Sequence, residues 1–487
     1  MQTSASPATK YDAVVVGAGP NGLCAAIALA RAKLSTLLVE ANDTAGGGAR
    51  THELTLPGFL HDACSSVHPL GMASPFLRTL KLEDHGVVWI DSPTPVVHLL
   101  DDGTVVRLER SIEATGEQFG ADADAYRRLV APFVEEWERL LPMILGPLRF
   151  PSDPLLMARF GLAAVRSMEG LARDTFRGVR PAALLAGIAA HAMLPLDQLV
   201  TASFGLVLAT AGHAVGWPIA RGGSQAITDA LVARFREHGG KLQLGSLVER
   251  IEDLPPARAY VFDVTPRQLL RIAGAKFPRS YVRRLQRFRY GPGVFKMDWA
   301  LSAPIPWRDP ACARACTVHL AGDLAQVSAA ERAVNDGKLA KRPFVLLVQP
   351  SLFDATRAPA GQHTAWAYCH TPHGATLNAS AAIEAQIERF APGFRDVILA
   401  RSQRNALEMQ AYNANYIGGD INGGVSDIGQ LFFRPVAKPD PYATPAPDVF
   451  VCSSSTPPGG GVHGMCGYWA ARSVLRRVFG IELEGFG

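Results

Sequence analysis

The sequence lacks the features that mark several other classes of protein. Its 487 residues contain no run of basic residues, and the net charge of +4 is small for this length, so we expect no nucleic-acid binding. The first ten residues are polar and include no apolar segment of the secretory type, so we expect no secretory signal. There is no HExxH pattern and no regular Cys/His spacing, so we expect no metal site.

Cysteines and long apolar runs are also scarce. The seven cysteines are odd in number and scattered, which is typical of free thiols in a reducing compartment and predicts a cytoplasmic protein. The apolar stretch 196–220 contains Asp197, His213 and Pro218, which favours a buried helix over a membrane span. Contact with the surface of a membrane stays an open alternative, and the sequence predicts no oligomeric state.

What the sequence does contain is enough apolar material for more than one core. Hydrophobic residues make up 48% of the chain and charged residues 19%, which excludes a disordered protein. A chain of 487 residues is too long for one compact core of ordinary size, so two domains are expected.

The segment 11–40 has the order strand, Gly-rich turn, helix, strand. A short apolar run at 13–16 suits a strand that is buried on both faces. The Ala- and Leu-rich stretch 23–32 predicts a helix, and 37–39 is a second apolar run. This order is the context in which a GxGxxG turn indicates dinucleotide binding.

The turn between them is Gly17-Ala18-Gly19-Pro20-Asn21-Gly22. Gly17 permits a tight turn, Gly19 lets the backbone approach a pyrophosphate, and Gly22 lets the helix pack closely on the strand. The helix N-terminus then presents free N–H groups to the phosphates. Glu40 ends the second strand, where its carboxylate can accept hydrogen bonds from both ribose hydroxyls of an adenosine.

Other elements are predicted more coarsely. Asp102-Gly103 between alternating apolar residues predicts a hairpin, and Ser111 is a predicted helix N-cap. Residues 155–215 are mostly helical in this interpretation, and 241–251 is a predicted strand. The end of the chain returns to a strand at 449–452, a Gly-rich turn and a helix at 468–478. A nucleotide-binding pattern at both ends predicts a discontinuous cofactor domain with a second domain inserted into it.

Several stretches resemble known flavoproteins. The run from GAGPNG through VEANDTAGGGART is similar to FAD-binding oxidoreductases of the glutathione-reductase-like group. The stretches PGFLHDACSSVHPL, DATRAPAGQHTAW and STPPGGGVHG resemble the phytoene-dehydrogenase-related branch more narrowly. That branch includes carotenoid desaturases, carotenoid isomerases, retinol-saturase-like proteins and one type of carotene ketolase. The resemblance covers about residues 11–478 and implies non-covalently bound FAD as the cofactor.

The resemblance also implies which residues bind FAD. Those at the adenosine and diphosphate end would be Gly17, Gly19, Pro20, Asn21, Gly22, Glu40, Ala41, Gly46, Gly47, Gly48, Ala49 and Arg50. Relatives often carry Arg where this chain has Gly48, so Arg50 is the candidate for the positive charge. Val248, in a strand that passes the adenine in relatives, is a further candidate.

At the other end of the cofactor, relatives cap the flavin with the C-terminal Gly-rich turn. Backbone N–H groups there would point at the pyrimidine end of the isoalloxazine and stabilise the reduced ring. The candidates are Ser453, Gly460, Gly461, Val462, His463, Gly464 and Met465. Ser453 stands where many relatives have an acidic residue. Apart from this C-terminal turn, in which residues 459–464 match the pattern, there is no second GxGxxG, so reduction by a nicotinamide is less expected than reduction by the substrate.

Catalytic residues are harder to predict because the expected chemistry needs placement more than a nucleophile. His463 could exchange a proton near the flavin, or it could only bond the backbone, and we hold the two interpretations equal. His68 lies in a segment that often runs past the flavin in relatives and is the second candidate. The pair His370 and His373 is better explained by a structural role at a strand end.

The sequence thus predicts an α/β fold with a Rossmann-like FAD domain and an inserted substrate domain of mixed sheet and helices. The FAD domain should comprise residues 1–85, 215–270 and 435–487, and the substrate domain residues 86–214 and 271–434. The expected function is FAD-dependent oxidation of a small hydrophobic substrate, isoprenoid, carotenoid or lipid-like, by desaturation. The alternatives are a polyene isomerase, saturase or ketolase, and a non-catalytic lipid or prenyl carrier.

Overall fold

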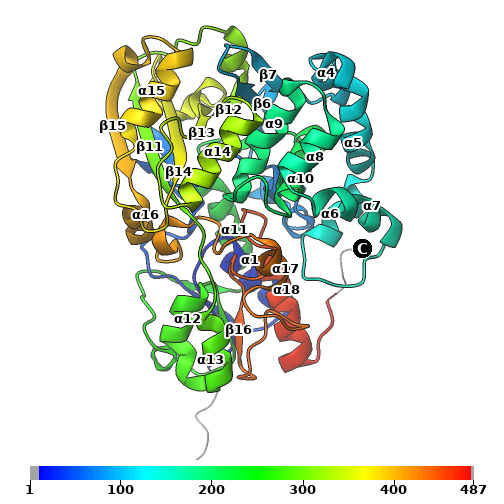
Figure 1. Cartoon of the computed structure of the whole chain (residues 1–487). Helices are drawn as coiled ribbons and strands as arrows, with labels where there is room; N and C mark the ends of the chain where they lie inside the picture. Colours follow the sequence, from blue (N-terminus) through cyan, green and yellow to red (C-terminus); the bar gives the residue numbers. More distant parts are fainter. Residues whose placement is uncertain (1–9, 484–487) are drawn as a thin grey trace, which may run out of the picture.

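The computed structural model describes residues 10–483 and is built around two sheets (Figure 1). The first is an all-parallel five-stranded sheet with the order β16-β10-β1-β2-β9. Its strands come from three distant parts of the chain: β1 (Tyr11–Val16), β2 (Thr36–Val39), β9 (Lys241–Gln243), β10 (Ala257–Phe262) and β16 (Val449–Val451). The predicted α/β class with a parallel and a mixed sheet is therefore confirmed.

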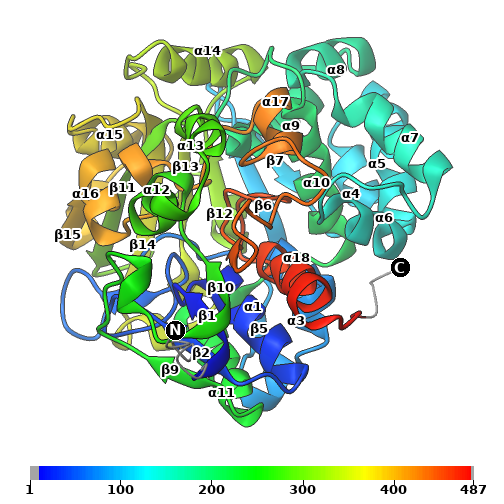
Figure 2. The ribbon, with the colours of Figure 1, turned by 90° about the horizontal axis from the view of Figure 1, so that it is seen from below.

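Helices α1 (Pro20–Arg31), α11 (Gln225–Glu237) and α18 (Met465–Val474) cover one face of this sheet. Helix α1 suits this buried position because it is rich in Ala and has Pro at its first turn. Figure 2 shows α18 beside α1. A Cβ on Gly467 of α18 would lie 1.9 Å from the Asn21 carbonyl oxygen, so only glycine permits this approach.

The opposite face is covered by α12 (Pro266–Ala273) and α13 (Arg279–Gln286). Leu269 and Leu285 share an apolar cluster with Val14 of the sheet. The predicted boundary at residue 270 is therefore misplaced, because it cuts α12 in two and assigns α13 to the wrong core. The remaining domain limits stay a prediction.

The second sheet is mixed and has seven strands in the order β15-β11-β14-β13-β12-β6-β7. Only the β6–β12 pair is parallel. Asp102-Gly103 forms the predicted turn between β6 and β7, and Gly103 has a φ of 88° there. The strands are β6 (Thr94–Leu99), β7 (Val105–Leu108), β11 (Gly293–Leu301), β12 (Ala315–Leu320), β13 (Val345–Val348), β14 (His363–Thr371) and β15 (Ile398–Arg404).

A helical layer packs on one face of the mixed sheet (Figure 1). It contains α4 (Ile112–Glu117), α5 (Ala123–Glu135), α6 (Trp137–Ile144), α7 (Pro154–Ala164), α8 (Met168–Thr175), α9 (Val179–Ala189), α10 (Thr201–Ala214) and α14 (Leu324–Asn335). Ser111 caps α4 as predicted, since its Oγ accepts the Ala114 N–H at 3.1 Å. The other face is covered by α15 (Ser380–Phe390).

Short elements connect the two sheets. They are α2 (Pro69–Ala73), α3 (Pro75–Arg78), α16 (Ala406–Tyr412), α17 (Ile428–Phe433), β3 (Thr51–Glu53), β4 (Leu60–Asp62), β5 (Trp89–Ile90) and β8 (Ile219–Ala220). None of the helices in the described part of the chain is long and apolar enough to cross a bilayer. All seven cysteines are free.

The predicted strand at 241–251 is wrong beyond its first three residues. β9 ends at Gln243, and Gly245 turns the chain with a φ of 63°. Its N–H then donates to the Asn42 carbonyl oxygen at 3.0 Å, and the Ser246 N–H donates to the Glu40 carbonyl oxygen at 2.8 Å. The chain leaves the sheet after Gln243 because its backbone then hydrogen-bonds to the loop that follows β2.

Candidate functional site

One large cavity, of about 580 Å³, lies where the two sheets meet. The Gly-rich turn after β1, the segment 64–71 and the C-terminal turn 457–463 line one part of it. Side chains of α7, α10 and the mixed sheet line the rest. Of the predicted site residues, the cavity wall includes Gly19, Pro20, Asn21, Gly47, Gly48, Ala49, His68, Gly460, Gly461, Val462 and His463.

The β1–α1 turn has the geometry of an anion cradle. A Cβ on Gly22 would lie 1.8 Å from the Gly17 carbonyl oxygen, so this turn can close only around glycine. Helix α1 begins after Gly19 and has no acidic residue in its first turn. Asn21 is buried, yet its Oδ1 has no hydrogen-bond partner. The tight glycine turn and the positive end of the helix dipole fit a bound diphosphate.

Glu40 is held in place by the turn it faces. Its Oε2 accepts the Ala18 N–H at 2.8 Å, and its Oε1 accepts the backbone and side-chain N–H groups of Asn42. Because a carboxylate oxygen accepts two hydrogen bonds, Oε2 can accept one more, as from a ribose hydroxyl. Ala41 follows directly, and Val248 is buried in one cluster with Val39 at the end of β2. Their contacts with a cofactor stay a prediction.

The second Gly segment explains why this chain has no Arg after the Gly pair. A Cβ on Gly48 would lie 2.0 Å from the Tyr416 hydroxyl, so Tyr416 fills that space. The Arg50 Nε donates to the Gly47 carbonyl oxygen at 3.0 Å, and its guanidinium lies 4.6 Å from the centre of the Tyr412 ring. Gly46 precedes this segment with a φ of 134°. Arg50 thus braces the Gly segment, and its predicted charge interaction with the diphosphate stays a prediction.

The C-terminal turn differs from the expectation at two positions. The Met465 N–H donates to the His463 Nδ1 at 3.1 Å, so it does not point into the cavity as predicted. Ser453 is buried below the wall, where its Oγ accepts the Ser455 N–H at 3.3 Å. Its neighbour Ser454 lines the cavity instead. β16 ends at Val451, and Ser453 and Ser454 belong to the turn that follows, so the sequence did not show which of the two faces the cavity.

His463 is bound to the backbone on both sides of its ring. Nδ1 accepts the Met465 N–H, so the ring proton is on Nε2, and backbone hydrogen bonds tie the ring to Gly460 and Gly459. Burial lowers the pKa of His463 to about 4, although these backbone hydrogen bonds oppose the shift. The ring is therefore neutral near pH 7 and has no free nitrogen, which supports the backbone interpretation of the two that the sequence left equal.

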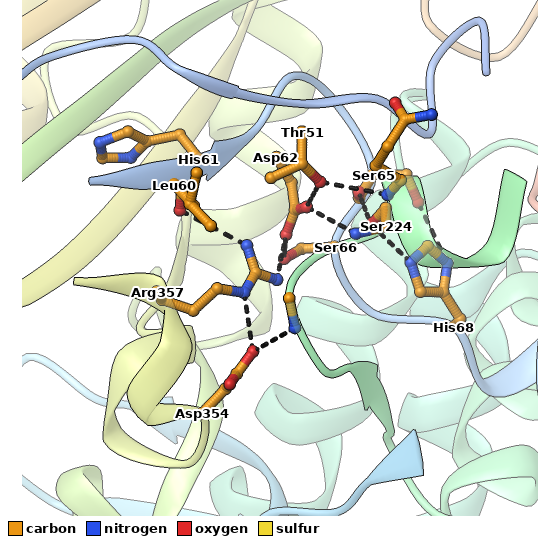
Figure 3. A network of polar contacts seen from close by, with 12 residues as sticks. Thr51, Leu60, His61, Asp62, Ser65, Ser66, His68, Ser224, Asp354 and Arg357 are labelled. Atoms are coloured by element: carbon orange, nitrogen blue, oxygen red, sulfur yellow. Dashed lines mark hydrogen bonds and ion pairs between the residues drawn. The ribbon is translucent and has the colours of Figure 1, made fainter. Parts of the chain in front are cut away.

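His68 has one strongly bound nitrogen, Nε2, and one weakly bound nitrogen, Nδ1, which lies 3.4 Å from the Ser65 Oγ (Figure 3). Its Nε2 lies 2.8 Å from the Ser224 Oγ, and that hydroxyl donates to the Ser65 carbonyl oxygen at 2.6 Å. Because the Ser224 proton is already used, Nε2 is the donor and Nδ1 carries the lone pair. Burial lowers the pKa of His68 to about 4. His68 is thus a neutral hydrogen-bond acceptor in the cavity wall.

A buried ionic network binds Ser224, the hydrogen-bond partner of His68. Sequence reasoning missed this network. Arg357 donates from Nη2 to Asp62 at 2.8 Å and from Nε to Asp354 at 3.1 Å, and all three side chains are buried (Figure 3). Asp62 in turn accepts the Ser224 N–H at 2.8 Å. Two of the motifs that carry the resemblance, PGFLHDACSSVHPL and DATRAPAGQHTAW, therefore meet at this network.

Asp263 is a further residue of the site that the sequence analysis missed. It follows β10 directly, lines the cavity, and accepts the Gly22 N–H through Oδ2 at 2.9 Å. Burial raises its pKa to about 7, the Gly22 N–H opposes this shift, and the negative charge of Glu40 adds to it. The sequence does contain one feature that could have indicated Asp263, namely an acidic residue at the end of a buried strand.

Comparison with known proteins gives the family. The family described as FAD dependent oxidoreductase (DAO) matches residues 12–269, just over half of the chain. The chain belongs to this family. Its cofactor is FAD, and the glycines that a Cβ would block and the N-terminus of α1 fit that cofactor.

Individual relatives are more distant. "Pyridine nucleotide-disulfide oxidoreductase domain-containing protein 2" of Rattus norvegicus is 26% identical over 96% of this chain and 94% of its own length. "Phytoene desaturase (lycopene-forming)" of Paracoccus sp. is 29% identical over 51% of this chain and 50% of its own. A solved oxidoreductase from Methanosarcina mazei shares the fold with a TM-score of 0.64 and 15% identity, covering 95% of this chain and 99% of that one.

The position of Asp263 predicts a pH-dependent affinity for FAD. A diphosphate dianion binds better beside a protonated carboxyl, and the protonated fraction falls as the pH rises through about 7. We expect FAD to bind up to about tenfold more weakly for each pH unit above that value. Asp263→Asn, which stays neutral, should bind FAD with little pH dependence.

The measurement is a titration of the apoprotein with FAD between about pH 6 and pH 9. Asp323→Asn is the control, because Asn can still cap α14 and residue 323 does not line this cavity. A wild-type affinity that does not change over this range would contradict the assignment.

Proposed function

We propose that this FAD-dependent oxidoreductase dehydrogenates a small hydrophobic substrate, isoprenoid, carotenoid or lipid-like. The observation that carries the proposal is that one cavity joins the FAD-binding turns to a long apolar lining. FAD would supply the acceptor for a hydride from a substrate carbon. The chain supplies binding, orientation and exclusion of water.

The lining favours an apolar substrate over a cationic one. It includes the apolar side chains of Met157, Phe160, Phe204, Val207, Leu208, Leu346, Val348 and Trp366. Among the described residues that line the cavity, Asp263 is the only carboxylate, and it lies at the dinucleotide turn. A substrate ammonium group would therefore be buried without a counterion in the apolar part, which is costly.

His68 is the proposed acceptor of the substrate proton. It lies in the cavity wall, and its Nδ1 holds a lone pair that the chain engages only through the distant Ser65 hydroxyl, at 3.4 Å. The Asp62–Arg357 network fixes the tautomer by orienting Ser224. His463, with both nitrogens bound, shapes the turn at the flavin instead. The partial similarity to phytoene desaturase supports the same class of reaction.

The test is the visible spectrum of the anaerobic holoprotein before and after addition of an apolar lipid extract from the source cells. Loss of the oxidised flavin spectrum would support dehydrogenation, and His68→Phe should slow that loss while retaining FAD. An unchanged spectrum would contradict it and favour the isomerase, saturase or ketolase alternatives. A protein that cannot be loaded with FAD would favour the carrier alternative.

We further propose that the protein reaches its substrate at a membrane surface through α7. Phe150, Leu155 and Leu162 are 87%, 84% and 77% exposed, although all three are large apolar residues. Helix α7 contains no acidic residue and exposes Arg159 on the same side, which suits a bilayer with anionic lipids. Its inner residues Met157 and Phe160 line the cavity, so the exposed face adjoins the substrate site.

Replacing Leu155 and Leu162 together by Glu should abolish binding to vesicles of anionic phospholipid, measured by flotation. The change removes apolar area and adds negative charge facing the lipid. Leu247→Glu is the matched control, since Leu247 is 62% exposed and does not line the cavity. Equal flotation of the double variant and the wild type would exclude this surface.

A further inference from the structure

Behind the apolar cavity lies a group of four histidines that neither FAD binding nor the proposed reaction uses. His98 on β6, His319 on β12 and His370 on β14 are buried, and His191 after α9 is partly buried. We call this group the imidazole chamber. His319 is fully buried, and neither of its ring nitrogens has a hydrogen-bond partner.

The chamber continues the floor of the cavity. Side chains two residues apart on a strand lie on the same face of a sheet. Thr317 and Tyr368 line the cavity, and the next residues on the same face are His319 and His370. His191 belongs to the cavity wall, and its ring centre lies 5.7 Å from that of His319. The histidines therefore lie directly beside the strand residues that line the cavity.

The hydrogen bonds in the chamber leave mostly acceptors. His98 donates from Nε2 to the Gly322 carbonyl oxygen at 2.6 Å, so its unpartnered Nδ1 is a lone pair. His191 donates from Nδ1 to the Ile188 carbonyl oxygen at 2.8 Å, which leaves Nε2 as an acceptor. His370 directs Nδ1 at Glu331 at 2.7 Å, and its Nε2 has no partner. Only His319 offers an unused N–H.

Two of these nitrogens lie beside the same glycine. A Cβ on Gly187 of α9 would lie 2.3 Å from the His98 Nδ1 and 2.8 Å from the His319 Nδ1. Only glycine therefore lets α9 approach both imidazoles this closely. Burial lowers the pKa of His98 and His191 to about 4 and that of His319 well below its ordinary value, and the neighbouring imidazoles lower it further. His98, His191 and His319 are therefore neutral near pH 7.

Three classes of occupant can be compared. In the described chain, no group of three or more His, Cys, Asp or Glu side chains is arranged to hold a metal ion. A cation would also enter an interior whose nearby carboxylate, Glu331, is already paired with His370. A neutral hydroxyl can donate to one lone pair and accept the His319 N–H, which would satisfy groups that are costly to leave unpaired.

We propose that the imidazole chamber binds a hydroxyl group at one end of the substrate, so that the substrate is an apolar molecule with a terminal alcohol. The inference rests on the proposed function and deepens it. The hydroxyl anchors one end of the molecule between His191 and His319, and the apolar remainder extends along the cavity toward the flavin site.

The test compares two probes, 1-octanol and its methyl ether, by calorimetric titration of the holoprotein. The ether keeps the oxygen acceptor and the apolar chain but cannot donate. We expect octanol to bind about tenfold more tightly, the effect of one hydrogen bond to a buried acceptor. In His191→Phe, which removes the acceptor of the hydroxyl proton and leaves the His319 N–H for the oxygen of either probe, the preference should disappear while the ether binds as before.

A second variant keeps the test decisive if His191→Phe does not fold. Gly187→Ala places a methyl group beside the His98 Nδ1 and should also remove the preference. Gly274→Ala is its control, because the nearest atom to the added Cβ would be 3.9 Å away. Flavin content and the thermal melting curve report the fold of each variant.

Equal affinities of the two probes for the wild type would mean that the chamber holds water only, and this would overturn the proposal. A preference that persists in both variants would place the hydroxyl elsewhere and would also overturn it. The binding test needs no turnover, so it is separate from the flavin-reduction test. If the flavin is reduced but octanol is not preferred, only the dehydrogenase proposal stands. If octanol is preferred but the flavin is not reduced, only the proposal of a hydroxyl site in the imidazole chamber stands.

Discussion

Arg357→Met should lower the free energy of unfolding by about 3–5 kcal/mol, the cost of leaving buried charges without their partner. Arg357 is fully buried and pairs with Asp62 and Asp354, which are equally buried. Methionine fills much of the same volume but leaves both carboxylates uncompensated. Asp62 also binds Ser224, which in turn binds His68. The variant should therefore also displace His68 in the cavity wall.

The measurement is urea unfolding of the holoprotein and the variant, followed by circular dichroism. Arg342→Met is the matched control, because Arg342 forms an ion pair with Asp101 at 2.7 Å but is 63% exposed. Such a surface pair contributes only about 0–1 kcal/mol. If both variants lost stability equally, the buried network would not be the cause.

The same network predicts acid sensitivity. Burial alone would raise the pKa of Asp62, but the Arg357 guanidinium and the hydrogen bonds from Ser66 and Ser224 hold it well below its usual range. A carboxyl with a lowered pKa stabilises the fold fully above its ordinary value of about 4 and loses that contribution as the pH falls below it. The free energy of unfolding of the wild type should therefore fall as the pH drops below about 4, because this network is lost. Arg357→Met already lacks the network and should not show this part of the fall.

Gly22→Ala should remove most of the FAD from the purified protein. The added Cβ would lie 1.8 Å from the Gly17 carbonyl oxygen, so the turn between β1 and α1 must open. Overpacking of this kind costs about 1–3 kcal/mol, which corresponds to a loss of FAD affinity of about tenfold to a hundredfold. The opened turn would also move the N–H that Gly22 donates to Asp263.

FAD content is measured as the ratio of flavin to protein after gel filtration, and affinity by titration of the apoprotein. Gly274→Ala, where the added methyl group has space, should retain FAD as the wild type does. A fully loaded Gly22→Ala protein would contradict the assignment of the turn as the diphosphate cradle.

Local patterns could predict the turn, Glu40 and the parallel sheet because each depends on neighbours in the sequence. Gly17 to Gly22 form one continuous turn, and the strand that ends at Glu40 is one apolar run. Asp263 contacts Gly22 across 241 positions, and Arg357 contacts Asp62 across 295. No spacing rule connects residues so far apart, so these contacts needed the structure.

The errors at the level of single residues have the same origin. The predicted strand at 241–251 has the right composition, but hydrogen bonds to the loop after β2 end it at Gln243. The Met465 N–H was expected to face the cavity, and the ring of His463 takes it instead. The roles of His68 and His463 could not be separated by sequence, because a tautomer depends on which neighbours donate and accept.

The order of strands in the parallel sheet has a consequence for how the protein matures in the cell. β1 is synthesised before its neighbour β10, and β10 is flanked on the other side by β16, which is synthesised after both. The turn that we expect to cap the flavin follows β16 directly. The growing chain therefore lacks a complete cofactor site until β16 and this turn have been made.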